Sequence, residues 1–154
     1  MPRLDANIFS ELNGVNGLTI TDLPTVDDFV SFATGDFNGD GIDDLAIGAD
    51  RSNSVYLIFG PLNTTATGSV PLASLMDGVK GFQVMSSSPY DGFGASVALV
   101  DINGDSKKDL IVIATDGYIA GIFGGPGPGT PSLDVGTIST SEGFVTIGAP
   151  EVFS

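Results

Sequence analysis

The chain has 154 residues, 42% of them hydrophobic and 22 of them glycine, which predicts one folded, turn-rich domain with a modest core. Its 19 Asp and Glu residues against 5 Lys and Arg give a formal net charge of -14, which excludes nucleic-acid or anionic-lipid binding through a basic surface. The absence of Cys and His excludes disulfides, zinc sites built on these ligands, Cys nucleophiles and His-based triads.

The chain carries no sequence signal for a membrane or a secretory pathway. It has no apolar run long enough to span a bilayer, so no membrane insertion is expected. Residues 1–7 lack the apolar centre of a signal peptide. If the protein is secreted, its signal is expected to lie outside this segment or to have been removed.

An internal repeat organises the chain. Similar short segments occur at residues 12–20, 75–84 and 141–147, and two longer similar units lie between them, at 31–48 and 96–113. Equivalent positions in the longer units are 65 residues apart, as for Asp36 and Asp101.

This spacing predicts a single repetitive domain over residues 1–154. The first repeat covers about 12–74, the second about 75–137, and a third begins at about 138–154.

Each repeat predicts short strands separated by turns. In chain order, the predicted strands are residues 31–35, 45–49, 54–59, 81–84, 96–100, 109–114 and 118–123. Val, Ile, Phe and Tyr are frequent in these runs, and Gly, Asn and Asp bound them. Asp116 and Gly117, between two of the runs, predict a tight hairpin turn. The Gly- and Pro-rich segment 124–131 predicts an exposed loop.

These elements predict an all-β fold made of β-propeller blades. Residues 110–113 are apolar without alternation, as in a strand that is buried on both faces. A four-stranded antiparallel sheet with two apolar faces needs a neighbour on each side, and radial stacking of such sheets supplies it. We therefore expect about two full blades and the start of a third.

Acidic and amide side chains recur at fixed positions between the first two strands of each repeat. Side-chain oxygens fall at positions 1, 3, 5 and 9 of both segments, and a backbone carbonyl is available at position 7. The predicted ligands are Asp36, Asn38, Asp40, Ile42 and Asp44 in the first loop, and Asp101, Asn103, Asp105, Lys107 and Asp109 in the second.

Calcium is the metal that this pattern favours. It takes six to eight oxygen ligands in a tolerant geometry, whereas magnesium needs a stricter octahedron and zinc, copper and iron favour His or Cys. An EF-hand is excluded, because position 12 is Ile47 in one loop and Val112 in the other instead of Glu. The remaining alternative is that Asp, Asn and Gly only mark turns, which two equivalent copies disfavour.

The two predicted calcium sites differ in local charge. Position 8 is Asp43 in the first loop and Lys108 in the second, and both are expected to face solvent. Lys107 and Lys108 place two positive charges in the second loop. We therefore expect the second site to bind calcium more weakly.

The order of these elements resembles FG-GAP repeats, the blades of integrin α-subunit heads and of many surface proteins. Phe93-Gly94 resembles the Phe-Gly half of the signature, and 112–115 stands at its Gly-Ala-Pro half. The first repeat has Gly48-Ala49-Asp50 at the latter position, and Phe29-Val30 in place of Phe-Gly. Gly148-Ala149-Pro150 matches the signature literally but lies out of register with it.

The resemblance implies a seven-bladed propeller in which calcium braces the loops of one face. It also implies an extracellular, cell-surface location and a role in adhesion or protein interaction. Two blades cannot close a ring, so the expected partners are other blades, either in a longer protein or in further copies. The protein or glycan ligand is not specified by the sequence.

Two other functional classes are alternatives. A secreted glycan hydrolase or lyase would use paired carboxylates, but nearly all clustered Asp residues belong to the predicted calcium loops. A lectin would use Tyr56, Tyr90 or Tyr118 for stacking, although no shared pocket is indicated. We therefore predict a binding or structural module without catalytic residues.

Overall fold

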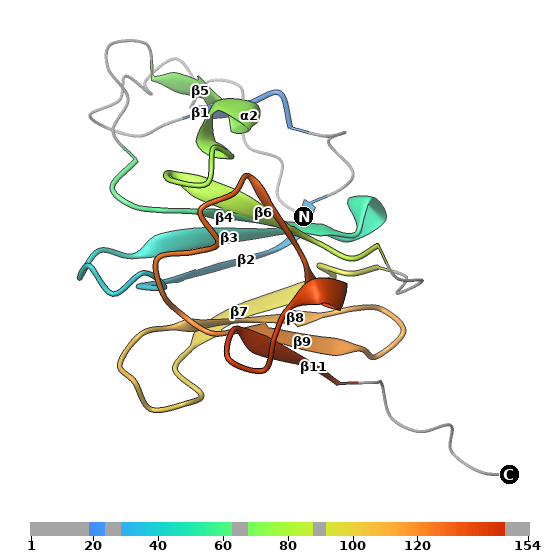
Figure 1. The fold of residues 1–154 in the computed structure, drawn as a ribbon. Helices are drawn as coiled ribbons and strands as arrows, with labels where there is room; N and C mark the ends of the chain where they lie inside the picture. The colour runs from blue at the N-terminus through green and yellow to red at the C-terminus, as the bar shows by residue number, and fades with distance from the viewer. Residues whose placement is uncertain (1–18, 24–28, 63–67, 88–91, 147–154) are drawn as a thin grey trace, which may run out of the picture.

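Two β-sheets packed face to face make up most of the structure (Figure 1). The computed structural model describes residues 19–23, 29–62, 68–87 and 92–146. Helical structure in these ranges is limited to α2 (Leu72–Leu75) and two 3-10 turns, Asp50–Ser52 and Val135–Thr137. The predicted all-β fold class is confirmed.

The first sheet contains an antiparallel run of four strands: β2 (Phe29–Gly35), β3 (Asp44–Ala49), β4 (Ser54–Ile58) and β6 (Gly81–Met85). A fifth strand, β10 (Ser132–Asp134), pairs with β6 in parallel at the outer edge. The first sheet is therefore a four-stranded antiparallel unit extended by a strand from far along the chain.

The second sheet repeats the four-stranded unit with β7 (Ser96–Val100), β8 (Asp109–Ile113), β9 (Ile119–Ile122) and β11 (Gly143–Thr146). All three of its pairings are antiparallel. Leu110 and Val112 of β8 are buried against the first sheet, but on the other face Ile111 is half-buried and Ile113 is 39% exposed, so β8 is not buried on both faces as predicted. Every predicted strand is present within two residues of its predicted bounds.

Sequence repeats and sheets are offset along the chain. Strand β6 follows residue 75, where the second sequence repeat begins, yet it completes the first sheet. In the same way β11 follows residue 138 and completes the second sheet. Two further strands, β1 (Thr19–Thr21) and β5 (Ser69–Pro71), form a separate parallel pair.

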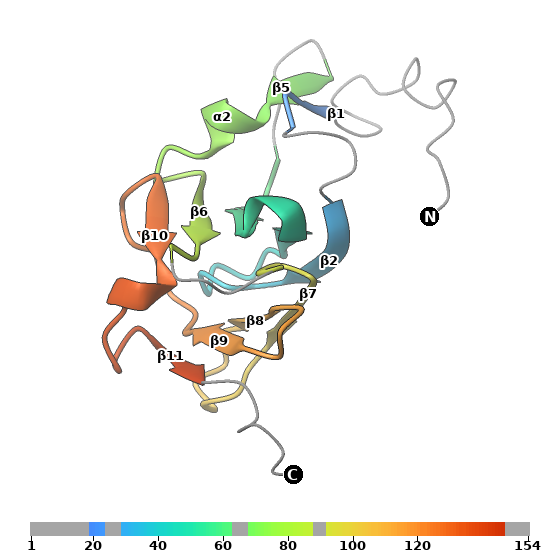
Figure 2. The same cartoon turned by 90° about the vertical axis from the view of Figure 1, so that its right-hand side faces the viewer.

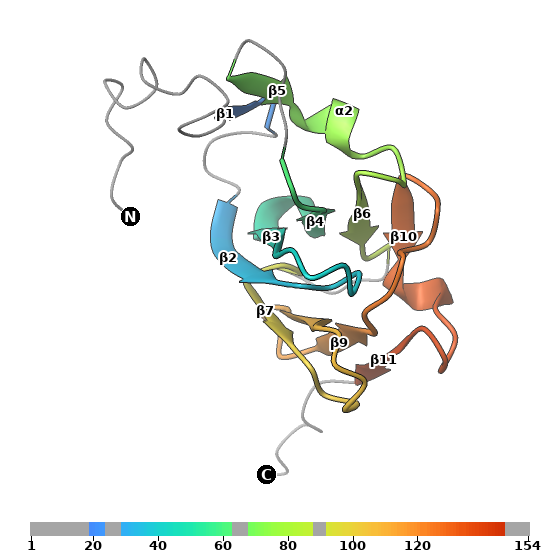
Figure 3. The same cartoon turned by 90° about the vertical axis from the view of Figure 1, so that its left-hand side faces the viewer.

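The larger hydrophobic core lies between the two sheets. Strand β2 of the first sheet runs beside β7 of the second (Figure 3). Side chains from the facing surfaces are buried together, among them Val55, Leu57 and Phe82 from the first sheet, and Leu110 and Val112 from the second. This arrangement matches the stacking of adjacent propeller blades.

A smaller core covers the opposite face of the first sheet. Ile47, Tyr56 and Ile58 are buried there beneath Leu72 and Leu75 of the α2 segment. The first sheet is thus covered on both faces, as a two-faced apolar sheet requires.

The backbones of the two sheets meet closely where the signature glycines lie. A Cβ atom built on Gly48 would lie 2.1 Å from the carbonyl oxygen of Gly94 and 2.3 Å from the Oγ atom of Ser31. A Cβ on Gly94 would lie 2.5 Å from the carbonyl oxygen of Ser54. The Phe-Gly half of the second repeat therefore fits against the Gly-Ala half of the first because neither glycine carries a side chain.

Replacing Gly48 with alanine should lower the free energy of unfolding by about 1–3 kcal/mol, because the added methyl group forces the two sheets apart. Urea unfolding followed by circular dichroism would measure the change. Gly125→Ala is the matched control, since a Cβ there meets nothing within 4 Å. Equal unfolding midpoints for the two variants would contradict the close contact between the sheets.

Part of the Gly- and Pro-rich segment is less exposed than the sequence predicted. Gly127 and Pro128 are half-buried, and a Cβ built on Gly127 would lie 3.1 Å from the ring of Phe82. The segment covers the first sheet on its way from β9 to β10 (Figure 2).

Within the described ranges, no helix is long and apolar enough to cross a membrane.

Candidate metal-binding loops

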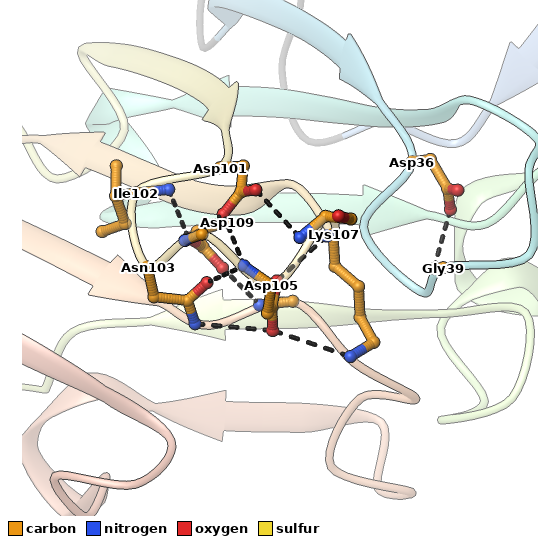
Figure 4. A network of polar contacts seen from close by, with 11 residues as sticks. Asp36, Gly39, Asp101, Ile102, Asn103, Asp105, Lys107 and Asp109 are labelled. Atoms are coloured by element: carbon orange, nitrogen blue, oxygen red, sulfur yellow. Dashed lines mark hydrogen bonds and ion pairs between the residues drawn. The ribbon is translucent and has the colours of Figure 1, made fainter.

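The two predicted calcium loops lie at the same end of the stacked sheets (Figure 1). The first connects β2 to β3 and the second connects β7 to β8. The backbone N–H of Lys108 donates to the carbonyl oxygen of Asp36 over 2.8 Å, which joins the two loops directly. The repeat and the sheet packing together therefore place the loops side by side (Figure 4).

Asp36, at position 1, organises the first loop. Its Oδ1 atom accepts from the N–H groups of Gly39 and Asp40 at 2.7 and 3.1 Å, and its Oδ2 atom accepts from Gly41 at 2.8 Å. The Asp36 carboxylate thus accepts hydrogen bonds from three N–H groups within the next five residues, as Asp does in turns and N-terminal caps.

Positions 3 and 5 of the first loop point toward each other. The Asn38 Nδ2 atom donates to Asp40 Oδ2 over 3.2 Å, and Asn38 Oδ1 accepts from the Asp40 N–H over 3.0 Å. Asp40 Oδ1 in turn accepts from the Ile42 N–H over 2.9 Å. Asp36, Asn38 and Asp40 therefore lie in one hydrogen-bonded loop that is exposed at Asp40.

Asp44, at position 9, lies beneath the loop and is 1% exposed. Its Oδ2 atom accepts from Phe37 and Asn38 N–H groups at 2.7 and 3.2 Å, and its Oδ1 atom accepts from Gly60 at 2.9 Å. Burial raises the pKa of the Asp44 carboxyl, and the hydrogen bonds from Gly60, Phe37 and Asn38 oppose that rise.

The second loop repeats the bonds around its first position (Figure 4). Asp101 Oδ1 accepts from Gly104 at 2.7 Å and from Asp105 at 3.2 Å, and Oδ2 accepts from Ser106 at 2.9 Å. The hydrogen bond from the Ser106 backbone, followed by those from Gly104 and Asp105, holds the pKa of Asp101 below its usual value.

The other polar positions of the second loop also match the first. Asn103 Oδ1 accepts from the Asp105 N–H over 3.1 Å, and Asp105 Oδ1 accepts from the Lys107 N–H over 2.9 Å. Asp109 is fully buried and accepts from Ile102 and Gly124, each over 2.8 Å. Two loops of different sequence therefore share one conformation.

The donor atoms of these loops fit a hard cation by their chemistry. Carboxylate, amide and backbone oxygens are the ligands that calcium takes. In the described part of the chain, however, no three acidic side chains lie close enough to form a metal cluster of carboxylates alone. Asp44 and Asp109 are directed at backbone N–H groups, so an ion would also need the oxygens of Asn38 or Asn103 and of the backbone.

The two loops differ in charge and in backbone strain. Lys107 Nζ lies 3.6 Å from Asp105 Oδ2, and its side chain packs beside Gly39 of the first loop. Asp43 and Lys108 are exposed, as predicted. Ser106 has a φ of 71°, where the first loop has Gly41 with a φ of 85°. A left-handed backbone is unfavourable for serine and easy for glycine.

Exchanging Ser106 for glycine should raise the free energy of unfolding by about 0.5–1 kcal/mol, since relief of the left-handed conformation exceeds the entropic cost of glycine. The reverse exchange, Gly41→Ser, should lower it by a similar amount, because the site is sterically open but the backbone is left-handed. Chemical denaturation would measure both. A stabilising effect of both exchanges would contradict this explanation.

Sequence reasoning missed the amides of Gly60 and Gly124, which each bond to the buried carboxylate at position 9. Each glycine directly follows a Phe at the end of the third strand, so the repeat itself carried the signal.

Of the tyrosines that could stack on a sugar, Tyr56 is 6% exposed in the smaller core and Tyr118 packs against the larger one. Tyr90 lies outside the described residues.

Comparison with protein families identifies the repeat. The model named FG-GAP repeat matches residues 29–71 and 93–133, more than half of the chain. The chain belongs to the FG-GAP repeat family. Each matched range contains one of the predicted metal-binding loops; the first also contains β5, and the second ends within β10.

The FG-GAP chain is also similar to part of two curated proteins. It is 37% identical over 82 residues to integrin alpha pat-2 of Caenorhabditis elegans, which covers 53% of this chain and 6% of that protein. It is 34% identical over 80 residues to integrin alpha pat-2 of Caenorhabditis briggsae, covering 52% and 6%. The aligned segment is therefore a small part of each relative.

Proposed function

We propose that this FG-GAP chain is a calcium-braced propeller module that acts outside the cell in adhesion or another protein interaction. The observation that carries the proposal is the pair of matching oxygen-rich loops, which adjoin through the Lys108–Asp36 backbone bond. Similarity to integrin alpha pat-2 supports the class of module, and other propeller blades are its expected partners.

Calcium would be held by side-chain oxygens at positions 1, 3, 5 and 9 and by the backbone at position 7. The expected ligands are those predicted from sequence, Asp36 to Asp44 and Asp101 to Asp109. When bound, the ion would neutralise acidic side chains that otherwise repel one another across a short loop. An extracellular location would supply calcium at the millimolar level at which weak sites are occupied.

The arrangement of the carboxylates favours a binding module over an enzyme. Asp36 accepts three backbone hydrogen bonds within its own loop, and Asp101 does the same in the second; Asp44 accepts two from its loop and one from Gly60. These carboxylates serve loop structure first, and each keeps about one of its four lone-pair sites, which suits a cation ligand.

Calcium at about 1 mM should raise the free energy of unfolding by roughly 1.4 kcal/mol for each site, if the dissociation constant is about 10⁻⁴ M. Asp36→Ala and Asp101→Ala should each remove the calcium-dependent stabilisation of one site. The loss should be smaller for Asp101→Ala, because Lys107 and Lys108 weaken calcium binding at the second site. Thermal melting in calcium and in chelator would measure these increments, and calorimetric titration would count the sites.

The matched control is Asp43→Ala, which removes an exposed charge from the first loop without removing a predicted ligand. Its calcium-dependent stabilisation should fall far less than that of Asp36→Ala, because the lost charge acts on the ion only from outside the predicted ligand set. Because Asp36 also holds the loop without calcium, each variant is compared with itself in the two buffers. Identical melting of the unmodified chain with and without chelator would refute the calcium proposal.

A further inference from the structure

Each of the two repeats contains a short strand that pairs in parallel with an earlier strand: β5 with β1, and β10 with β6 at the outer edge of the first sheet. We name these segments strap 1 (residues 68–75) and strap 2 (residues 131–138). The Thr19 N–H donates to the Gly68 carbonyl over 2.7 Å, and the Gln83 N–H donates to the Pro131 carbonyl over 2.9 Å. Gly68 and Pro131 are the first residues of the two straps, so the same bond starts both pairings (Figure 2).

Aliphatic side chains anchor both straps. In strap 1, Val70 is half-buried and Leu72 is buried in the smaller core. In strap 2, Leu133 is half-buried and Val135 is buried in the core between the sheets. The straps share a sequence pattern, a serine followed by aliphatic residues at the second and fourth positions and a hydroxyl residue at the sixth. A strap thus combines strand pairing with a hydrophobic anchor.

In the first sheet, the strap and the segment that leads to it cover three aromatic rings. Phe37, Phe59 and Phe82 have ring centroids 6.0–6.3 Å apart. Gly127 lies against the rings of Phe59 and Phe82, and Phe37 and Phe82 are only 1% and 0% exposed. Strap 2 therefore closes this end of the first sheet.

The second sheet has apolar side chains at the three positions equivalent to these rings, but in the described residues no strap covers them. Phe123 and Phe144, the counterparts of Phe59 and Phe82, are 6.2 Å apart and half-buried. Ile102 replaces Phe37 and is 45% exposed. Among the described strands β11 pairs only with β9, so the backbone of Val145, the counterpart of Gln83, has one side without a strand partner there.

We infer that the outer edge of β11, together with Ile102, Phe123 and Phe144, is a binding site for the strap of a further FG-GAP repeat. The proposal deepens the proposed function, because it rests on the chain acting as part of a propeller. The strap would run parallel to β11 and place its two aliphatic residues over the ring pair, as strap 2 does on the first sheet.

A further repeat fits this site better than a second copy of the chain. Strap 1 is already paired with β1 and strap 2 with β6, so a second copy would first have to release one of its own straps. Releasing strap 2 would expose Leu133 and Val135 and uncover the aromatic rings of its own first sheet. A repeat whose strap has no sheet of its own to cover meets no such cost.

Disulfide trapping on the full chain tests the site, because the chain contains no cysteine. The probe is a synthetic peptide of residues 124–138 in which cysteine replaces Ser132. In the first sheet Ser132 lies opposite Gln83, and Val145 is the counterpart of Gln83 in the register of β11, so the chain variant is Val145→Cys. In glutathione buffer the mixed disulfide should form roughly tenfold more with this peptide than with a scrambled peptide carrying the same cysteine.

A second register checks the geometry. Val84 lies opposite Leu133 in the first sheet, so Thr146→Cys should trap the peptide with cysteine in place of Leu133, at a lower yield than the first pair because Leu133 is one of the aliphatic anchors. Adding Ile102→Ser to the Val145→Cys chain should lower the yield roughly threefold to tenfold, because less apolar surface is covered. Val79→Ser is the matched control, since Val79 is 77% exposed in the turn before β6. It should leave the yield unchanged.

Equal trapping of strap and scrambled peptides in both registers, in variants with the parental unfolding midpoint, would overturn the site. So would a homodimer in native mass spectrometry that excess strap peptide does not dissociate, because a second copy would then occupy the edge. Loss of trapping with calcium-dependent melting intact would count against the strap site alone. Specific trapping without any calcium effect would count against the calcium proposal alone.

Discussion

Replacing Asp44 with alanine should lower the free energy of unfolding by about 3–5 kcal/mol in calcium-free buffer. The carboxylate is 1% exposed and accepts hydrogen bonds from three backbone N–H groups, those of Phe37, Asn38 and Gly60. Alanine leaves these donors without their acceptor at the base of the loop, and each such loss costs about 1–3 kcal/mol when water cannot replace the bond. Urea unfolding in chelator would measure the structural effect without any contribution from an ion.

Two substitutions make this experiment specific. Asp43→Ala removes a neighbouring exposed carboxylate and should change stability by less than about 0.5 kcal/mol. Asp44→Asn keeps the shape of the side chain but replaces one accepting oxygen with a donating NH₂ group. Its loss of unfolding free energy should therefore lie between those of Asp43→Ala and Asp44→Ala. A neutral Asp44→Ala variant would mean that the loop does not depend on its buried carboxylate.

The Phe82→Ala variant should lose about 3–5 kcal/mol of unfolding free energy. Phe82 is 0% exposed and packs within 6.0 Å, centroid to centroid, of both Phe37 and Phe59. Removing the ring leaves a cavity between the loop of the first sheet and the segment that leads to strap 2. The segment 124–131 should therefore become more open to protease, which limited proteolysis would detect alongside the unfolding midpoint.

Phe32→Ala provides the matched control. Phe32 is 56% exposed on β2, so truncating it should cost less than about 1 kcal/mol. A comparable loss for Phe32→Ala and Phe82→Ala would contradict the difference in burial on which the prediction rests.

Much of the fold was accessible from local patterns. Runs of β-branched and aromatic residues bounded by Gly, Asn and Asp located every predicted strand to within two residues. The loop residues were located because their hydrogen bonds are also local: Asp36 bonds to N–H groups three, four and five residues ahead. The conformation of such a loop depends little on the rest of the protein.

The straps could not be predicted in this way. Strands β5 and β10 have three residues each, and β5 ends in proline, so neither shows a strand-like period. Each exists because it pairs in parallel with a strand distant in sequence, as Leu133 does with Val84. Such pairing depends on contacts that no local pattern records.

The sequence by itself therefore determined the repeat, the strands within it and the two acidic loops, because these depend on side-chain period and on bonds between near neighbours. The tertiary structure alone decided which strands share a sheet, why Gly48 faces Gly94, and why Phe37 is buried while its counterpart Ile102 is exposed. These features depend on which sheet and which strap lie next to a residue. Stacking sets those neighbours by burying apolar surface between segments far apart in the chain.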